Sequence, residues 1–193
     1  MIVKICGITN LEDARVAVDA GADLIGFILY PKSPRYVDPA IIATITAALR
    51  LEHGAAAPGF VGVFVNTPLA EIRTTMSTAG LDYAQLHGNE TADALAALAG
   101  RAYKALRPAT AEQARSEAAH FFRTDPAPGP RLMVDAYEPA EYGGTGKKAE
   151  WHAAAQVARA YQEFMLAGGL TPENVAAAVA TVRPWGVDVA SGV

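Results

Sequence analysis

Short apolar runs alternate with Ala-rich stretches along the whole chain, and this alternation limits the fold more than any other feature of the sequence. Eight runs are dense in Val, Ile, Leu and Phe, which is typical of strands that are buried on both faces. They read "IVKIC" from Ile2, "DLIGFIL" from Asp23, "FVGVFV" from Phe60, "YAQLH" from Tyr83, "AYKALR" from Ala102, "RLMVDAY" from Arg131, "EFMLAGG" from Glu163 and "GVDVASG" from Gly186. Strands that alternate with helices predict a parallel sheet.

The stretches between these runs carry helix signals. Asn10 is suited to cap a helix over residues 11–20, which would stop at Gly21. Pro68 and Pro172 stand where a first helical turn would begin. A further helix is predicted from Asn89 to Gly100.

A parallel sheet of this kind is either open and doubly wound or closed into a barrel. A doubly wound nucleotide-binding sheet normally has a G-x-G-x-x-G turn after its first strand, whereas this chain has "GITN" there. Eight strand–helix units favour a (β/α)₈ barrel, and we expect it to occupy residues 1–193 as one domain.

The eighth unit is short. The last predicted strand begins at Gly186 and the sequence ends at Val193, so the helix that would complete the barrel is missing. We therefore expect the native chain to continue for roughly 15–20 residues, which is enough for a turn and a helix.

Composition limits the kinds of partner that the protein can bind and the cellular compartment that we expect for it. A net charge of −4 gives no basic footprint for nucleic acid, and no apolar stretch is long enough to span a membrane. One cysteine cannot form an internal disulfide, and the N-terminus lacks the features of a signal peptide, so we expect a cytoplasmic protein. The four histidines show no metal-ligand spacing.

Polar residues mark the ends of several predicted strands. Cys6 ends the first, His87 the fourth and Asp135 lies near the end of the sixth, while Arg35 lies in the loop after the second. Active sites of such barrels lie at the carboxyl ends of the strands, so these four side chains should meet at one mouth. Strand alternation also places Lys4 on the same inward face as Cys6.

Glycines follow the last two strands. Gly168 and Gly169 lie in "AGGL" before a helix expected near Thr171, and Ser191 and Gly192 lie in "SGV". Barrels often bind a phosphate between these two loops through backbone N–H groups, so a phosphorylated small molecule is the expected ligand. A third cluster, "GGTGKK" at 143–148, does not fit the Walker pattern and is interpreted as a mobile or substrate-covering loop.

Each residue also has an ordinary structural interpretation. A lone cysteine is usually a small core residue, and an aspartate at a strand end often forms a turn. Arg35 could be a solvated loop charge, and His87 could be a hydrogen-bonding group beside a helix. The glycine pairs could be ordinary loop residues. Their convergence on one barrel mouth favours the functional interpretation.

Seven segments together resemble the phosphoribosylanthranilate isomerase family, in family order across essentially the whole chain. They are "KICGIT", "SPRYV", "GVFVN", "LDYAQLHG", "VDAYEPAEYGGTGKK", "FMLAGGLTPENV" and "GVDVASGV". The resemblance implies a (β/α)₈ barrel of tryptophan biosynthesis that works without a cofactor. It converts N-(5′-phosphoribosyl)anthranilate to 1-(2-carboxyphenylamino)-1-deoxyribulose 5-phosphate by an Amadori rearrangement. Two positions depart from the family pattern: Ala149 replaces an aromatic residue, and Ala190 replaces the first of two serines.

The same resemblance implies that Cys6 is the general base, Asp135 the general acid and Arg35 the partner of the anthranilate carboxylate. Cys6 must then ionise, and we expect Lys4 to lower the pKa of its thiol. Asp135 must keep its proton until the sugar ring opens. Two alternatives remain, a different sugar-phosphate isomerase or epimerase and a non-catalytic binding protein, and the chain could be a monomer or a homodimer.

Overall fold

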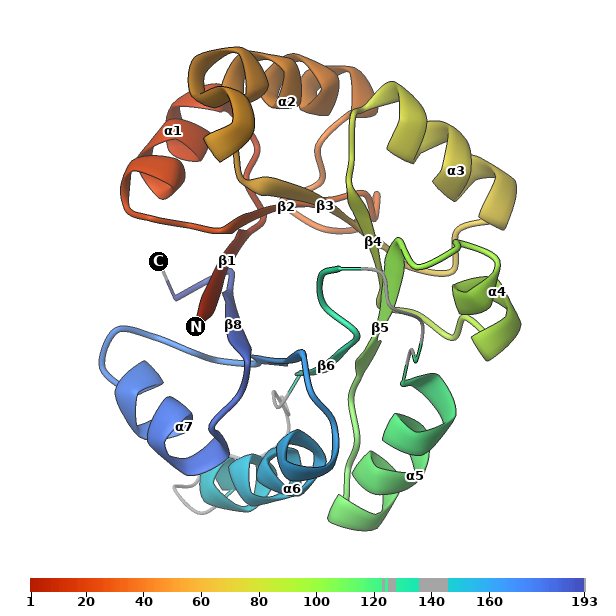
Figure 1. Cartoon of the computed structure of the whole chain (residues 1–193), viewed down its shortest axis with the longest axis vertical. Coiled ribbons are helices and arrows are strands. Elements are labelled where there is room, and N and C mark those ends of the chain that lie inside the picture. Colours follow the sequence, from red (N-terminus) through yellow and green to blue (C-terminus); the bar gives the residue numbers. More distant parts are fainter. Residues whose placement is uncertain (123, 125–127, 136–145, 193) are drawn as a thin grey trace.

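Eight parallel strands close into a barrel in the computed structural model, which describes residues 1–122, 124, 128–135 and 146–192 (Figure 1). The strands follow chain order around the barrel, and β8 pairs with β1 to close it. They are β1 (Ile2–Cys6), β2 (Leu24–Ile28), β3 (Gly59–Phe64), β4 (Tyr83–Leu86), β5 (Ala102–Leu106), β6 (Leu132–Asp135), β7 (Phe164–Ala167) and β8 (Gly186–Val189). The predicted barrel fold is confirmed.

Helices lie around the barrel and cover the outer face of most of its sheet, with a gap between α1 and α7 outside β1 and β8 (Figure 1). They are α1 (Leu11–Asp19), α2 (Pro39–His53), α3 (Leu69–Thr78), α4 (Ala92–Ala96), α5 (Ala111–Phe121), α6 (Gly146–Ala160) and α7 (Val175–Val182), with a 3₁₀ turn, η1 (Gly54–Ala56), after α2. Among the described residues, none of these helices has the length and hydropathy that crossing a membrane requires.

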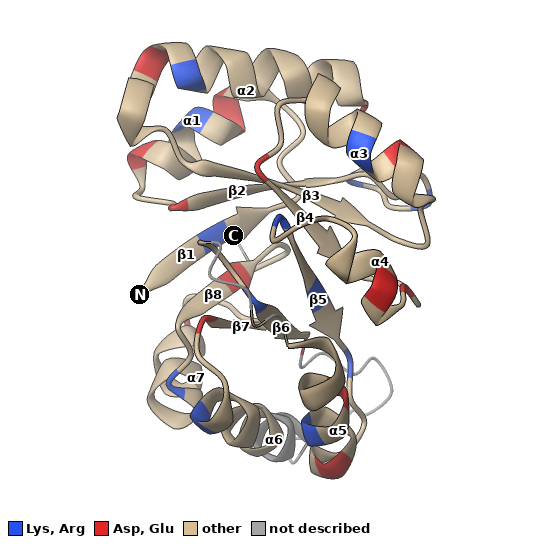
Figure 2. Cartoon of the chain, turned by 45° about the vertical axis from the view of Figure 1, so that its right-hand side comes forward, with Lys and Arg blue, Asp and Glu red and all other residues tan. Residues whose placement is uncertain are grey.

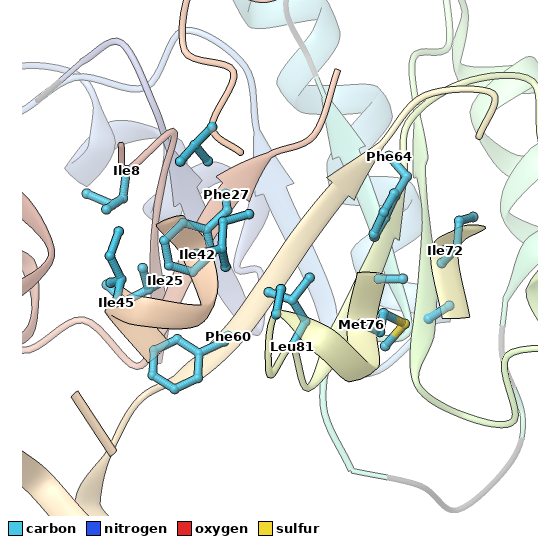
Figure 3. Close-up of a cluster of buried hydrophobic side chains, with 14 of the residues drawn as sticks. Ile8, Ile25, Phe27, Ile42, Ile45, Phe60, Phe64, Ile72, Met76 and Leu81 are labelled. Carbon is cyan, nitrogen blue, oxygen red and sulfur yellow. The ribbon is translucent and has the colours of Figure 1, made fainter. Parts of the chain in front are cut away.

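Alternate strand residues point outward and pack against the helices. Phe27 and Phe60 are fully buried there, in a cluster that extends along α2 and α3 (Figure 3). A second cluster joins the later strands to α5, α6 and α7. Burial of these apolar faces is the main source of stability in a layered fold of this type.

The inward residues fill the barrel and divide it into two parts. Large side chains such as Tyr103, Met133 and Met165 pack at its amino-terminal end. Closer to the carboxyl end, several inward-facing side chains are polar, among them Lys4, Gln85 and Asp188. Figure 2 shows this change as blue on β1 and red on β8, while most charge lies on helices and loops. The apolar end therefore supports a polar site at the carboxyl end.

Helix starts account for the main differences from the predicted elements. Asn10 caps α1 as predicted, since its Oδ1 accepts from the Asp13 amide at 2.8 Å. The predicted helix from Asn89 to Gly100 is wrong in extent, because α4 covers only Ala92–Ala96 and Thr91 caps it. The Asn89 amide instead donates to Asn66 Oδ1, which ties that residue to the loop after β3.

The start of α7 also differs. Residues 172–174 form a turn, and the helix begins at Val175 rather than near Thr171 or Pro172. The Thr171 amide donates to Asn174 Oδ1 at 2.9 Å, which stabilises the turn in place of a first helical turn. The expected substrate-covering loop, 143–148, lies largely outside the described residues, as does the side chain of Ala149.

Candidate active site

A cavity of about 280 Å³ opens at the carboxyl ends of the strands. Six of the eight residues predicted for the site line it: Cys6, His87, Asp135, Gly168, Gly169 and Ser191. Gln85, Asp188 and Ala190 contribute to the same wall. The expected meeting of polar side chains from separate strands is therefore present in the structure.

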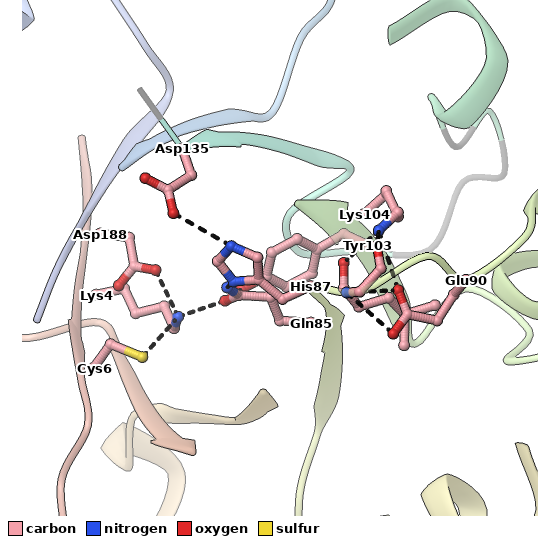
Figure 4. A network of polar contacts seen from close by, with 11 residues as sticks. Lys4, Cys6, Gln85, His87, Glu90, Tyr103, Lys104, Asp135 and Asp188 are labelled. Carbon is pink, nitrogen blue, oxygen red and sulfur yellow. Dashed lines mark hydrogen bonds and ion pairs between the residues drawn. The ribbon is translucent and has the colours of Figure 1, made fainter. Parts of the chain in front are cut away.

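Lys4 lies at the floor of this cavity and is fully buried. Its Nζ donates to Asp188 Oδ2 at 2.8 Å and to Gln85 Oε1 at 2.6 Å, and it lies 3.4 Å from Cys6 Sγ (Figure 4). Gly26 on β2 makes room for this arrangement, since a Cβ at that position would lie 2.7 Å from Cys6 Sγ and 2.8 Å from Lys4 Cε. The predicted common face of Lys4 and Cys6 is confirmed.

Burial and charge act in opposite directions on these groups. Burial alone would lower the pKa of Lys4, but Asp188, Cys6 and Tyr103 raise it above its usual value, so Lys4 is an ammonium. Burial raises the pKa of the Cys6 thiol to about 11 and outweighs the lowering effect of Lys4. Lys4 lowers the pKa of Cys6 as expected, but removal of the thiol from water has the larger effect, so the net shift is upward.

His87 connects the floor of the cavity to Asp135. Its Nε2 lies 3.3 Å from Asp135 Oδ2, and its Nδ1 lies 3.1 Å from Gln85 Nε2 (Figure 4). Both His87 and Asp135 are partly exposed to the cavity, with about a fifth of each side chain accessible. Cys6 on β1 and Asp135 on β6 come from strands that are separated by β7 and β8.

A buried ion pair fixes the loop that carries His87. Lys104 Nζ on β5 lies 3.1 Å from Glu90 Oε2 and donates to the Gly88 carbonyl at 2.6 Å. Glu90 accepts from the amides of Gly88 and Asn66, which joins the ends of β3 and β4 (Figure 4). Burial alone would raise the pKa of Glu90, but the amides of Asn66 and of Glu90 itself, together with Lys104, bring it below its usual value.

Arg35 does not line the cavity. Its side chain lies over Gly7, which follows Cys6, and a Cβ on Gly7 would lie 2.9 Å from Arg35 Cδ. Gly7 also has a φ of +83°, a conformation that other residues rarely adopt. Glycine at position 7 therefore lets the arginine stem cross the end of β1 close to Cys6.

The two predicted phosphate loops lie side by side. Gly168 and Gly169 both have positive φ angles, and the side chain of Asn174 braces this turn by donating to the Gly169 carbonyl at 2.8 Å. Gly192 does not line the cavity; it packs against the backbone of Leu170, where a side chain would clash. The first loop thus suits glycine because of its backbone conformation, and the second because of close packing.

Some residues of the site were not identified from the sequence. Asp188 follows Gly186 by two positions on β8, so strand alternation could have placed this carboxylate inside the barrel. The sequence does not indicate the pairing of Glu90 with Lys104. Lys104 lies on the outward face of β5, and the two residues come into contact only because of the path of the folded loop.

Polar side chains and glycine loops at the carboxyl end of a closed eight-stranded barrel define a (β/α)₈-barrel enzyme site. Residues 3–193 match the sequence model of N-(5′phosphoribosyl)anthranilate (PRA) isomerase. The chain is 45% identical over 194 residues to the N-(5′-phosphoribosyl)anthranilate isomerase of Pelobacter propionicus, a match that covers 99% of this chain and 85% of that protein. The chain belongs to the PRA isomerase family.

Solved structures agree with this assignment. A crystal structure of phosphoribosyl anthranilate isomerase from Thermotoga maritima superposes with a TM-score of 0.84 at 38% identity, over 100% of this chain and 89% of that one. A phosphoribosyl anthranilate isomerase in complex with reduced 1-(o-carboxyphenylamino)-1-deoxyribulose 5-phosphate has a TM-score of 0.81 at 34% identity, with the same coverage.

Replacement of Lys104 tests the ion pair beneath the His87 loop. We expect Lys104→Met to lower the free energy of unfolding by about 3–5 kcal/mol, because Glu90 is left buried without its counter-charge. Urea unfolding measures this loss. Asp82→Asn serves as the control: Asp82, directly before β4, pairs with Arg50 in a much more exposed position. It should cost no more than about 1 kcal/mol. Equal losses in the two variants would contradict the special position of Lys104.

Proposed function

We propose that the chain converts N-(5′-phosphoribosyl)anthranilate to 1-(2-carboxyphenylamino)-1-deoxyribulose 5-phosphate, an aldose-to-ketose isomerisation in tryptophan biosynthesis. The observation that carries this proposal is the cavity shared by Cys6 and Asp135, two proton-transfer groups on different strands of a PRA isomerase barrel. A fluorescence assay that follows the loss of phosphoribosylanthranilate tests the activity directly.

Asp135 acts first in the proposed mechanism. It protonates the ring oxygen of the furanose as the C1′–O bond breaks, and the lone pair of the anthranilate nitrogen completes an iminium. Its position at the carboxyl end of β6, facing the cavity, supports this role. General acid catalysis of this kind contributes about 10²–10⁴ in rate.

Cys6 first releases its thiol proton to water in the open cavity, and the thiolate then removes the proton from C2′. The resulting enolamine tautomerises to the ketone. Burial keeps Cys6 a neutral thiol at neutral pH, since its pKa is about 11. The iminium brings a positive charge into the cavity beside the Lys4 ammonium, and two nearby cations favour the thiolate. The ionised form of Cys6 is therefore favoured at the step that needs it.

The remaining residues bind the two ends of the substrate. The Arg35 guanidinium, which lies near Cys6 over Gly7, pairs with the anthranilate carboxylate in a bidentate fork. Gly168, Gly169, Ser191 and Gly192 form the two loops proposed for the phosphate. Asp188 Oδ1 is buried and has no partner among the described residues, so it can accept from a sugar hydroxyl.

We further propose that the enzyme is cytoplasmic and acts as a monomer or homodimer. The phosphoribosylanthranilate isomerase of Thermotoga maritima is dimeric, and monomers generated from it have been solved. Sedimentation of the purified protein distinguishes them.

Cys6→Ser should fold but lose most of its turnover, because a serine hydroxyl does not ionise near neutral pH. The fluorescence assay measures kcat. In the wild-type protein, alkylation of Cys6 by iodoacetamide should accelerate as pH rises toward about 11, since only the thiolate attacks the reagent. Near-normal turnover of Cys6→Ser would remove this residue from the mechanism.

Asp135→Asn should be nearly inactive, with kcat lower by about 10²–10⁴, because an amide cannot deliver the proton that opens the ring. It should still bind reduced 1-(o-carboxyphenylamino)-1-deoxyribulose 5-phosphate, which calorimetry can measure. Substantial turnover would mean that another acid serves, and His87, 3.3 Å away, is the first to test.

Arg35→Ala should raise KM strongly, with a loss of about 2–5 kcal/mol if the carboxylate pair is desolvated in the complex. A substrate analogue without the carboxylate should bind equally well to the wild type and the variant. If both ligands lose the same affinity, Arg35 acts on another part of the substrate.

A further inference from the structure

Gln85 lies at the centre of the polar network beneath the cavity. The residue is 2% exposed, and its Oε1 accepts from Lys4 Nζ at 2.6 Å and from the Tyr103 hydroxyl at 2.9 Å. Its Nε2 lies 3.1 Å from His87 Nδ1 (Figure 4). Every polar atom of this buried amide therefore has a partner.

These neighbours leave the amide only one orientation. An ammonium group has donors and no acceptor, so the Gln85 atom that faces Lys4 must be its oxygen. Lys4 is kept in the ammonium form by Asp188, its neighbour in the register of β1 and β8. The NH₂ group of Gln85 must then face His87.

The orientation of the amide in turn selects one form of the imidazole. An amide NH₂ only donates, so Nδ1 of His87 must accept, and the proton of the neutral ring is on Nε2. Nε2 is the atom that lies 3.3 Å from Asp135 Oδ2. We propose that Gln85 is a positioning residue that fixes this tautomer of His87, so that an N–H group always faces the carboxyl group of Asp135.

This inference rests on the proposed function, in which Asp135 gives its proton to the sugar ring oxygen. The carboxylate left behind accepts a hydrogen bond from Nε2–H of His87, which stabilises the negative charge, and His87 itself transfers no proton. The opposite tautomer would turn an unshared pair toward Asp135. That pair would accept the Asp135 proton in a hydrogen bond and hold it back from the substrate.

Two substitutions of Gln85 distinguish an effect on the His87 tautomer from an effect on the stability of the whole protein. Gln85→Glu keeps the shape of the side chain but replaces the NH₂ group with an acceptor, so Nδ1 should carry the proton and Nε2 should lose it. Gln85→Met removes the selection, so both tautomers should be populated. Nitrogen-15 NMR of the imidazole rings in the ligand-free protein, at a pH where they are neutral, distinguishes the two forms. The His87 signals are assigned by their loss in His87→Gln.

The same variants are then assayed for turnover. We expect kcat to fall about ten- to a hundredfold in Gln85→Glu, with a smaller change in KM, because the hydrogen bond from Nε2–H matters most after Asp135 has ionised. Gln85→Met should lie between Gln85→Glu and the wild type in both measurements.

Thr46→Val is the matched control. Thr46 is also 2% exposed, and its hydroxyl donates to the Ala79 carbonyl at 2.9 Å on the outer side of the sheet. Its loss should lower the melting temperature without changing kcat or the His87 signals. A Gln85 variant that behaves in the same way would show a purely structural role and overturn the proposal.

The NMR measurement needs no substrate, so it stands even if the protein does not consume phosphoribosylanthranilate. Failure of the wild-type assay would reject the proposed function, whereas an Nε2–H tautomer that persists in Gln85→Glu would reject the role of Gln85. A shifted tautomer with unchanged kcat would reject the contribution of His87 to catalysis. If Gln85→Met does not fold, the isosteric Gln85→Glu carries the test alone.

Discussion

The buried pair of Lys4 and Asp188 is the interaction on which the rest of the site depends. An ammonium group inside a barrel is tolerated only because a carboxylate and an amide oxygen surround it. Once Lys4 is charged, the orientation of Gln85 follows, and through it the form of His87. Cys6 also takes its electrostatic surroundings from the same ammonium. One buried charge therefore organises groups on β1, β4 and β8.

The site combines two environments within a short distance. At its floor the groups are buried and mostly paired, whereas His87 and Asp135 at the rim are partly accessible. Burial raises the pKa of Cys6 and keeps it unreactive, which protects a thiol that would otherwise be open to oxidation. Reactivity then requires a change in local charge, and in the proposed mechanism the cationic intermediate supplies it.

The barrel and six of the residues that line the cavity could be predicted because they depend on local pattern. Strand alternation placed Cys6 and Lys4 together, and the position of Asp135 near a strand end placed it at the mouth. The pKa of Cys6 could not be predicted, because it depends on how far folding removes the thiol from water. The contact of Glu90 with Lys104 could not be predicted from the sequence either, since it depends on the path of a loop.

Lys4 and Asp188 face each other where the first and last strands meet. A partly folded chain that has not yet joined β1 to β8 would have to bury the ammonium without its counter-ion, which is strongly unfavourable. The charge is therefore accommodated only when the two ends of the chain come together. Such an arrangement penalises half-closed barrels and favours an all-or-none transition, so the residues that prepare the site for chemistry also make folding cooperative.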